Sequence, residues 1–250
     1  MFETEISYCA RLLRQQDPDR YLTALFAPAE RREALFALYA FNLELARAHE
    51  VARPLAAAVA AQGLDRLLLE ELIDAREQDM EPDPPADLAA LLDYARGTSS
   101  TLVELALEIL GRPDGATREA GRALGIAWAL VGLLRAVPFH AAQRRLYLPA
   151  SLTEEAGLKP GQLYEHGTSP ELREVVRRLA KEAERWLKEA RRSRSAVARR
   201  YQPALLPAVL ARGHLSRLAT AGYDPFDARV QLPPPGRIWN LAWRRILGGY

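Results

Sequence analysis

Two long segments of this chain are apolar on nearly every side of the helix that each one predicts. Residues 28–51 begin with a proline followed by acidic residues, as helix starts prefer, and residues 116–137 carry few charges after Arg122. The first segment places large apolar side chains on all of its faces: Leu35, Phe36, Leu38, Tyr39, Phe41, Leu43 and Leu45. A helix without a polar face must be surrounded by other parts of the chain. The sequence therefore predicts an all-α fold built around two buried helices.

Further helical patterns account for most of the remaining chain. They span residues 64–80, 87–110, 170–200, 203–221 and 237–247. The pattern at 170–200 is strongly amphipathic and rich in charge, so we expect one face of that helix to be exposed. Only the four residues Arg145–Leu148 alternate as a strand would. We therefore predict one helical domain over residues 1–250; the arrangement of its helices as a bundle around a central cavity is an expectation from the family resemblance described below.

The composition limits the class of protein and its partners. A chain of 250 residues, 49% of them hydrophobic, can form one substantial core, and a net charge of +2 gives no reason to expect nucleic acid as a partner. The single Cys9 excludes an intramolecular disulfide and suits a reducing compartment. The first residues lack the pattern of a secretory signal, and no apolar run reaches the length of a membrane-spanning helix. We expect a cytoplasmic protein that can lie peripherally at a membrane.

The segment Gly125–Pro149, GIAWALVGLLRAVPFHAAQRRLYLP, resembles the catalytic segment of squalene and phytoene synthases, which reads LRDxxED and then RxYLP. The two aspartates that close the DxxxD motif of this family correspond to Ala136 and His140. Asp residues four apart lie on one helical face and can hold Mg²⁺ with oxygen ligands, whereas Ala cannot ligate and imidazole is a poor ligand for Mg²⁺. Pro138, between them, should kink or end the helix. The resemblance therefore implies a lost metal site on this helix.

A second segment, YAFNLELARAHE at Tyr39–Glu50, resembles the helix on which active members of the family carry DDxxD. The acidic positions of that motif fall on Ala46, Arg47 and Glu50, so one carboxylate remains of three. Arg47 places a positive charge where the family binds a cation, which reverses the local electrostatics. We predict no catalytic residue at these positions, no metal ligand set and no cofactor. Mg²⁺ would be needed only if the chain were an active enzyme.

The order of several weaker motifs extends the resemblance along almost the whole chain. The segments LIDAREQDM, YARGTSSTLVELALEILG and GYDPF resemble segments of the family. Four details are more similar to the branch related to mitochondrial complex I assembly factors than to the catalytic branch: Arg76-Glu77, Thr98-Ser99-Ser100, VPFH and the C-terminal tail. The chain is also shorter than the family pattern near residues 52–55. The resemblance implies an isoprenoid-synthase fold and a catalytically inactive protein that binds complex I subunits or assembly intermediates at the cytoplasmic face of a bacterial inner membrane.

Two other functions are consistent with these residues. A prenyltransferase with a rebuilt site would need Glu50 to converge with Glu77 or Asp79 as metal ligands. A binding protein for an isoprenoid or another lipid could keep the cavity without the chemistry. The resemblance suggests Tyr39, Arg135, Arg145 and Tyr147 as ligand-binding candidates, since guanidinium groups bind phosphate without a metal. The alternative is that the arginines pair with acidic side chains and fix helix packing.

The predicted C-terminal helix places Trp239, Ala242, Trp243 and Ile246 on one face, with arginines near the edges of that face. This pattern is typical of a helix that lies at a membrane surface. It is equally typical of a helix that packs its tryptophans against its own domain. We favour the second arrangement slightly on the sequence alone.

Overall fold

The fold of the chain is an assembly of helices, seen in a computed structural model that describes residues 5–43, 49–233, 236–247 and 249–250. No strand occurs in these ranges, which confirms the all-α prediction. The α-helices are α1 (Glu5–Gln16), α2 (Pro18–Ala24), α3 (Ala29–Leu43), α4 (His49–Gln62), α5 (Arg66–Glu77), α6 (Leu88–Ala95), α7 (Thr101–Leu110), α8 (Gly115–Ala142), α9 (Ala150–Ala156), α10 (Pro160–His166), α11 (Pro170–Ala190), α12 (Gln202–Leu205), α13 (Pro207–Thr220), α14 (Ala228–Gln231) and α15 (Arg237–Leu247).

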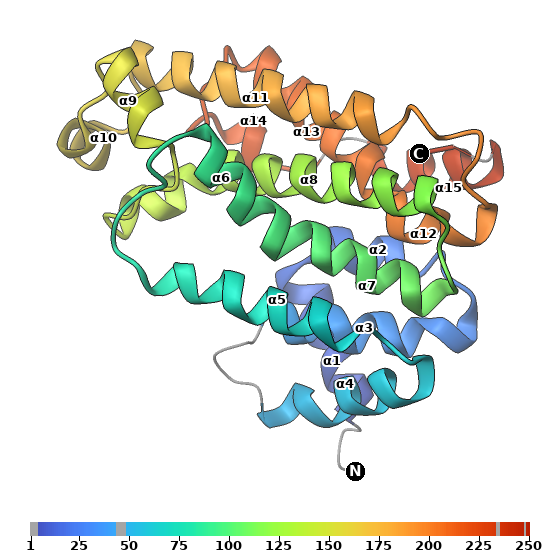
Figure 1. The fold of residues 1–250 in the computed structure, drawn as a ribbon. Helices are drawn as coiled ribbons and strands as arrows, with labels where there is room; N and C mark the ends of the chain where they lie inside the picture. Colours follow the sequence, from blue (N-terminus) through green and yellow to red (C-terminus); the bar gives the residue numbers. More distant parts are fainter. Residues whose placement is uncertain (1–4, 44–48, 234–235, 248) are drawn as a thin grey trace.

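The longest helix, α8, lies in the middle of the molecule (Figure 1). In that view α11 runs along its upper side and α7 crosses below it, while α5 and α3 follow underneath and α1 and α4 are lowest. By length and composition α8 could cross a membrane, contrary to the expectation from the sequence that no apolar run is long enough. Its place between α7 and α11 instead identifies it as the core helix of this bundle.

Polar caps define where most of the longer helices begin. The side chains of Asp65, Asp87, Asp114 and Ser169 each accept a hydrogen bond from a backbone N–H in the first turn of the following helix. Such caps satisfy donors that have no partner inside the helix and stabilise each helix by about 1 kcal/mol. The predicted starts of α5, α6, α8 and α11 therefore lie within two residues of the observed ones.

Two predicted helix ends are wrong. The helix that starts at Pro170 ends at Ala190 and not at Arg200, because the residues after Ala190 are mostly arginine and serine and offer no apolar face to bury. Conversely, α8 continues through Pro138 to Ala142. A proline removes only its own N–H donor, and near the end of a helix few later residues depend on that turn.

The junction that we expected to be short, residues 52–55, is helical and lies inside α4. Residues 44–48, which would join α3 to α4, lie outside the described part of the chain, so the predicted continuous helix over 28–51 is described only up to Leu43 and again from His49.

A short π-helical segment, η3 (Arg96–Ser100), interrupts the single helix predicted at 87–110 and separates α6 from α7. Two glycines allow neighbouring helices to approach it closely. A Cβ atom on Gly97 would lie 2.5 Å from Cβ of Ala75 on α5, and one on Gly125 of α8 would lie 2.4 Å from Cα of Ser100. These two contacts bring α5 and α8 together around η3, and the candidate site forms beside it.

Candidate functional site

Asp79 is the acidic side chain on which the first group of polar contacts converges, and it lies in the 3-10 turn η2 (Gln78–Met80) that follows α5. The hydroxyl groups of Tyr94 and Tyr147 donate to its Oδ1 atom over 2.7 and 3.0 Å, and Nη1 of Arg76 donates to Oδ2 over 3.1 Å. Nη2 of the same guanidinium donates to Oδ1 of the buried Asn42 on α3 over 3.1 Å. This Asp79 network therefore joins α3, α5, α6 and the segment after α8 through one cation and one carboxylate.

Both tyrosines of the Asp79 network are held in their neutral, donating form. Burial and the negative charge of Asp79 raise the pKa of Tyr147 to about 12, and the pKa of Tyr94 is also raised, mainly by burial. The ring of His140 lies 4.6 Å from that of Tyr147, and Cζ of Arg145 lies 4.8 Å from the Tyr147 ring centroid. Burial and the nearby Arg145 lower the pKa of His140. At neutral pH His140 is therefore an uncharged ring packed on Tyr147.

The described residues of this region do not fit Mg²⁺. Ala136 and His140 both lie on α8, as the sequence indicated, while Ala46 and Arg47 lie outside the described residues and the side chain of Glu50 is not described. Asp79 already accepts three hydrogen bonds, one of them from a guanidinium, so its oxygens face donors. Within the described ranges, no three His, Cys, Asp or Glu side chains lie close enough together to hold a metal ion.

A cavity of about 440 Å³ lies next to the Asp79 network and shares Arg76 and Tyr94 with it. Its deepest charged group is Asp19, whose side chain is 7% exposed. Three basic side chains surround this carboxylate: Nη1 of Arg237 lies 2.9 Å from Oδ1, Nε2 of His214 lies 3.0 Å from Oδ2, and Nη1 of Arg135 lies 3.9 Å from Oδ2. The Asp19 cluster thus joins α2, α8, α13 and α15.

Burial and ion pairing oppose each other in the Asp19 cluster. Burial alone would raise the pKa of Asp19, but the hydrogen bond to His214 and the charges of Arg135 and Arg237 lower it overall. Burial lowers the pKa of His214, and nearby Arg135 lowers it further. The ring atom Nδ1 of His214 has no hydrogen-bond partner among the described residues. A neutral His214 that donates from Nε2 to an ionised Asp19 satisfies these observations, since only an acceptor atom is then left unpaired.

Several polar atoms of the cavity are buried without a hydrogen-bond partner in the described part of the chain. They are Nε of Arg76, Nε of Arg135 and Oγ of Ser99. The lining of the cavity also includes the apolar side chains of Trp128, Val131 and Leu133. A buried donor without a partner costs about 1–3 kcal/mol, so this cavity is better suited to a ligand that carries an acceptor and an apolar part than to an empty apolar space.

The four ligand-binding candidates do not meet in one place. Arg135 lines the cavity and pairs with Asp19, whereas Arg145 and Tyr147 line a separate pocket of about 280 Å³ and contact the acidic segment through Glu81 and Asp79. Tyr39 is buried and lies outside both linings, and Cζ of Arg20 is 5.7 Å from its ring centroid. Arg135 therefore lies near a carboxylate outside the acidic run, and Arg145 donates to the backbone carbonyl oxygen of Glu81. A role of these arginines in ligand binding or in helix packing stays a prediction.

Sequence reasoning missed Asp19, Arg76 and His214. Asp19 and His214 are partners 195 residues apart, and Arg76 connects the nearby Asp79 to Asn42, which is 34 residues away in the sequence. The Asp17-Pro18-Asp19 start of a short helix is an ordinary capping pattern, so no local signal separates Asp19 from a solvated carboxylate.

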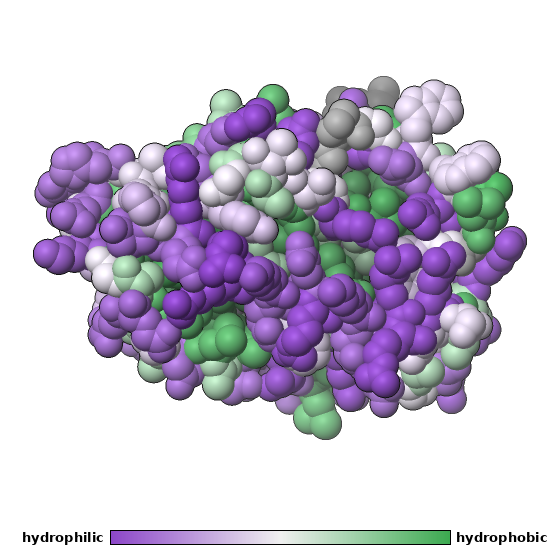
Figure 2. Space-filling view, turned by 90° about the horizontal axis from the view of Figure 1, so that it is seen from above, coloured by the Kyte–Doolittle hydropathy of each residue, from purple (hydrophilic) through white to green (hydrophobic). Residues whose placement is uncertain are grey.

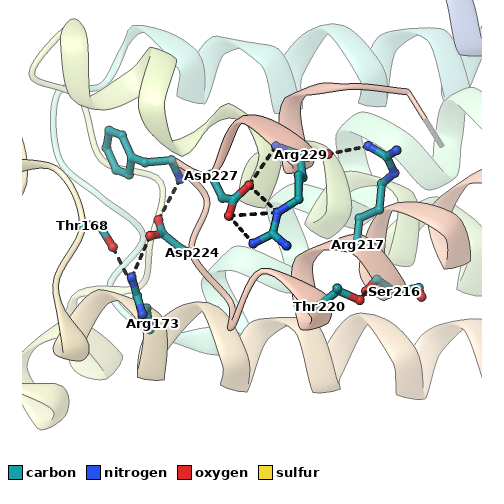
Figure 3. A network of polar contacts seen from close by, with 9 residues as sticks. Thr168, Arg173, Ser216, Arg217, Thr220, Asp224, Asp227 and Arg229 are labelled. Atoms are coloured by element: carbon teal, nitrogen blue, oxygen red, sulfur yellow. Dashed lines mark hydrogen bonds and ion pairs between the residues drawn. The ribbon is translucent and has the colours of Figure 1, made fainter. Parts of the chain in front are cut away.

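The GYDPF segment after α13 has a structural role. Asp224 accepts from Nη2 of Arg173 on α11 over 2.8 Å and from the backbone N–H of Phe226 over 3.0 Å, as Figure 3 shows. In the same view Arg229 folds back onto Asp227. These contacts attach the turn after α13 to α11, and they lie apart from the residues that line the cavity.

The outward face of α15 overturns the arrangement that we favoured from the sequence. The side chain of Trp239 is 81% exposed and that of Trp243 is 62% exposed, while the inner side carries Leu241 and the paired Arg237. The tryptophans therefore point away from the domain, because the positions facing it are held by one leucine and by arginines with partners on other helices.

Comparison with known proteins agrees with this architecture. A family model described as squalene/phytoene synthase matches residues 13–49 and 44–236, two matches that meet near the junction of α3 and α4. The chain is 29% identical to complex I assembly factor 6 of Bos taurus and of Homo sapiens, over 95% of this chain and 82% of each relative. It is 35% identical to presqualene diphosphate synthase of Rhodopseudomonas palustris, over 38% of this chain and 35% of that protein.

A solved dehydrosqualene synthase with bound ligand superposes with a TM-score of 0.83 at 18% identity, over 96% of this chain and 94% of that structure. This likeness shows the all-α isoprenoid-synthase fold. Because the family model matches most of the length of this chain, the chain belongs to the squalene/phytoene synthase family.

Proposed function

We propose that this chain is a non-catalytic member of its family that helps to assemble respiratory complex I. The observation that carries the proposal is the alignment with the complex I assembly factors, which extends over nearly the whole chain. The site supports it: Ala136 and His140 occupy the acidic positions of the family motif, and Asp79 is held by Arg76 and two tyrosines. The partners would be complex I subunits or assembly intermediates.

The test of assembly is a deletion of the gene in the cell that encodes this chain. We expect assembled complex I, measured on native gels and as NADH oxidation by membranes, to be lost and then restored by the wild-type chain. Presqualene diphosphate synthase of Rhodopseudomonas palustris serves as the control that shares the family and should not restore it. Normal complex I in the deletion strain would rule out the proposed role.

The test of catalysis is incubation with farnesyl or geranylgeranyl diphosphate and Mg²⁺. We expect no squalene-type or phytoene-type product, because the carboxylates that would hold the metal are replaced at Ala136 and His140. The active relative named above is the positive control. Robust turnover would instead support a prenyltransferase with a rebuilt site, in which Asp79 would have to exchange its present partners for a metal.

A lipid or isoprenoid ligand is a second candidate function, favoured by the cavity beside Asp19. Arg76 and Arg135, which each carry a buried donor without a partner among the described residues, line the same cavity as Trp128 and Leu133. Mass spectrometry of the protein after mild extraction should then detect a bound anionic amphiphile, and Arg135→Gln should reduce its occupancy. Protein free of ligand after such extraction would argue against this function.

We also propose that the protein lies at the cytoplasmic face of the inner membrane and contacts it through Trp239 and Trp243. The support is the exposure of both side chains on α15, a helix whose Arg237 and Arg245 instead pair with residues of other helices. Tryptophan rings are favoured at the boundary between lipid and water, where one part of the ring system can remain hydrated.

A further inference from the structure

A surface helix usually packs its apolar face against the protein, but α15 exposes most of its large apolar side chains. Its inward side carries Leu241, Arg237 paired with Asp19, and Arg245, which donates to Gln202 over 3.1 Å. Its outward side exposes five large apolar residues: Ile238, Trp239, Trp243, Ile246 and Leu247. In Figure 2 pale and green side chains gather at the upper right, over the end of the molecule that α15 occupies. An exposed apolar face of this size indicates a surface that binds a membrane or another protein.

Beside this face lies a group of four arginines, here called the arginine cluster: Arg191, Arg194, Arg212 and Arg244. The first two follow α11, the third belongs to α13 and the fourth to α15. The C-terminal residues hold these elements together. The Tyr250 hydroxyl donates to the carbonyl oxygen of Ala190 over 3.2 Å, and the Gly249 N–H donates to that of Arg244 over 2.9 Å. A Cβ atom on Gly249 would lie 2.6 Å from Nη2 of Arg194, so the guanidinium rests against glycine backbone.

The arginine cluster lacks the acidic partners that other arginines have. None of its four members forms an ion pair or donates a side-chain hydrogen bond to another residue within the ranges that the structure describes. Nε of Arg191 and Nη2 of Arg212 are buried without any partner there. By contrast, Arg185 and Arg192, which flank the end of α11, pair with Glu182 and Glu189.

This arrangement is unfavourable for the isolated protein. Burial lowers the pKa of Arg191 and of Arg212, and the positive charges of the other cluster members lower both further. Four like charges with buried, unpaired donors cost free energy unless an anion joins them. Guanidinium groups bind phosphate oxygens with paired hydrogen bonds, which makes phosphate the best-matched anion.

We propose that the arginine cluster binds the phosphate group of an anionic membrane lipid while the apolar face of α15 enters the lipid–water boundary. Arg244 belongs to the same helix as Trp243, so the phosphate site and the apolar face would meet one leaflet together. The net charge of the whole protein is only +2, so attraction to an anionic surface has to come from a local concentration of charge such as this one. The inference rests on the membrane contact proposed above and is independent of the role in complex I assembly.

Vesicle sedimentation of the full chain tests the site. We expect binding to phosphatidylcholine vesicles that contain phosphatidylglycerol to be much tighter than binding to pure phosphatidylcholine, and high salt to remove the difference. The double substitution Arg191→Gln and Arg212→Gln should weaken binding to the anionic vesicles about 25-fold, at about five-fold for each arginine near the surface. It should leave the weaker binding to neutral vesicles, which depends on α15, unchanged.

A matched control removes the same charge from the same region without touching the cluster. Arg185→Gln with Arg192→Gln removes two ion-paired arginines beside it and should keep the preference for anionic vesicles. Trp239→Ser with Trp243→Ser should weaken binding to both kinds of vesicle. Arg191→Lys with Arg212→Lys keeps the charge but loses the paired donors. The affinity of this variant for anionic vesicles should lie between that of the wild type and that of the glutamine variant.

Three results would overturn the proposal: equal binding to neutral and anionic vesicles, equal losses in the cluster and control variants, or binding of free inorganic phosphate without any binding of vesicles. The thermal midpoint of the glutamine variant should not fall, because the substitution relieves repulsion, so a loss of binding is not a loss of fold. Absent vesicle binding together with loss of complex I in the deletion strain would reject the lipid site and leave the assembly role intact.

Discussion

Arg76 is the residue that holds the Asp79 network together. Its guanidinium donates to Asn42 on α3 and to Asp79 after α5, so one side-chain cation connects these two parts of the chain. A guanidinium offers only donors, so each of its contacts needs an acceptor such as the Asp79 carboxylate or the Asn42 carbonyl.

The His214 ring predicts how stability depends on pH. Its pKa is lowered in the folded protein from an ordinary value of 6.5, so the unfolded chain binds a proton first as the pH falls. The stabilising contribution is complete above pH 6.5 and is lost as the pH falls from there toward the folded pKa, by at most about 1.4 kcal/mol per pH unit. Urea unfolding at pH 7.5, 6 and 5 should therefore give a decreasing free energy of unfolding.

His214→Gln should make that decrease smaller, since Gln can donate to Asp19 but does not titrate. Some dependence of the free energy of unfolding on pH should remain in this variant, because the pKa of His140 is also lowered in the folded protein. Asp19 affects stability at lower pH than His214 does. The pKa of Asp19 in the folded protein lies below the ordinary 3.8, so its contribution to the free energy of unfolding is lost only as the pH falls below that value. An unchanged pH dependence in the His214 variant would contradict a neutral, buried His214.

At the scale of elements, the helix α8 both packs in the core and contains the residues that differ from the family motif. Its first half packs against η3 through Gly125, and its second half carries Arg135, which lines the cavity, and His140, which packs on Tyr147 of the Asp79 network. The position of these residues therefore depends on the closeness of the contact at Gly125.

Two glycines of α8 give a matched pair of substitutions. Gly125→Ala should destabilise the protein by about 1–3 kcal/mol, because the added methyl would lie 2.4 Å from Cα of Ser100, which is backbone and cannot move aside. Gly132→Ala should stabilise it by about 0.5–1 kcal/mol, because that glycine is exposed and nothing lies within 4 Å of the new methyl. Denaturant unfolding of both variants measures the difference, and equal effects would contradict the close contact at η3.

At the scale of the molecule, one apolar core connects the first helix to the last residues. The same cluster of buried side chains includes Leu13 on α1, Leu38 on α3, Leu124 on α8, Val176 on α11 and Tyr250. A second, much smaller cluster of buried side chains contains Leu206, Leu210 and Leu241.

A continuous core predicts one cooperative unfolding transition. A variant with Trp239→Phe and Trp243→Phe keeps only Trp128 and Trp186 as core-facing fluorophores and should change the free energy of unfolding by less than about 0.5 kcal/mol, because both substituted side chains are exposed. Its fluorescence and far-ultraviolet circular dichroism should then lose signal at the same denaturant concentration. Two separated transitions would instead indicate that α1–α4 form an independent unit.

The sequence by itself determined the all-α class, the burial of the helices at α3 and α8, and the absence of acidic residues at positions 136 and 140, because periodicity and residue identity are local properties. Only the tertiary structure decided what surrounds Asp19 and Asp79 and which way Trp239 points. Asp19 meets residues 195 and 218 positions later in the chain, and no short pattern encodes such pairings. For α15 the pattern allowed two orientations, and contacts of Arg237 and Arg245 with other helices selected the one that leaves the tryptophans exposed.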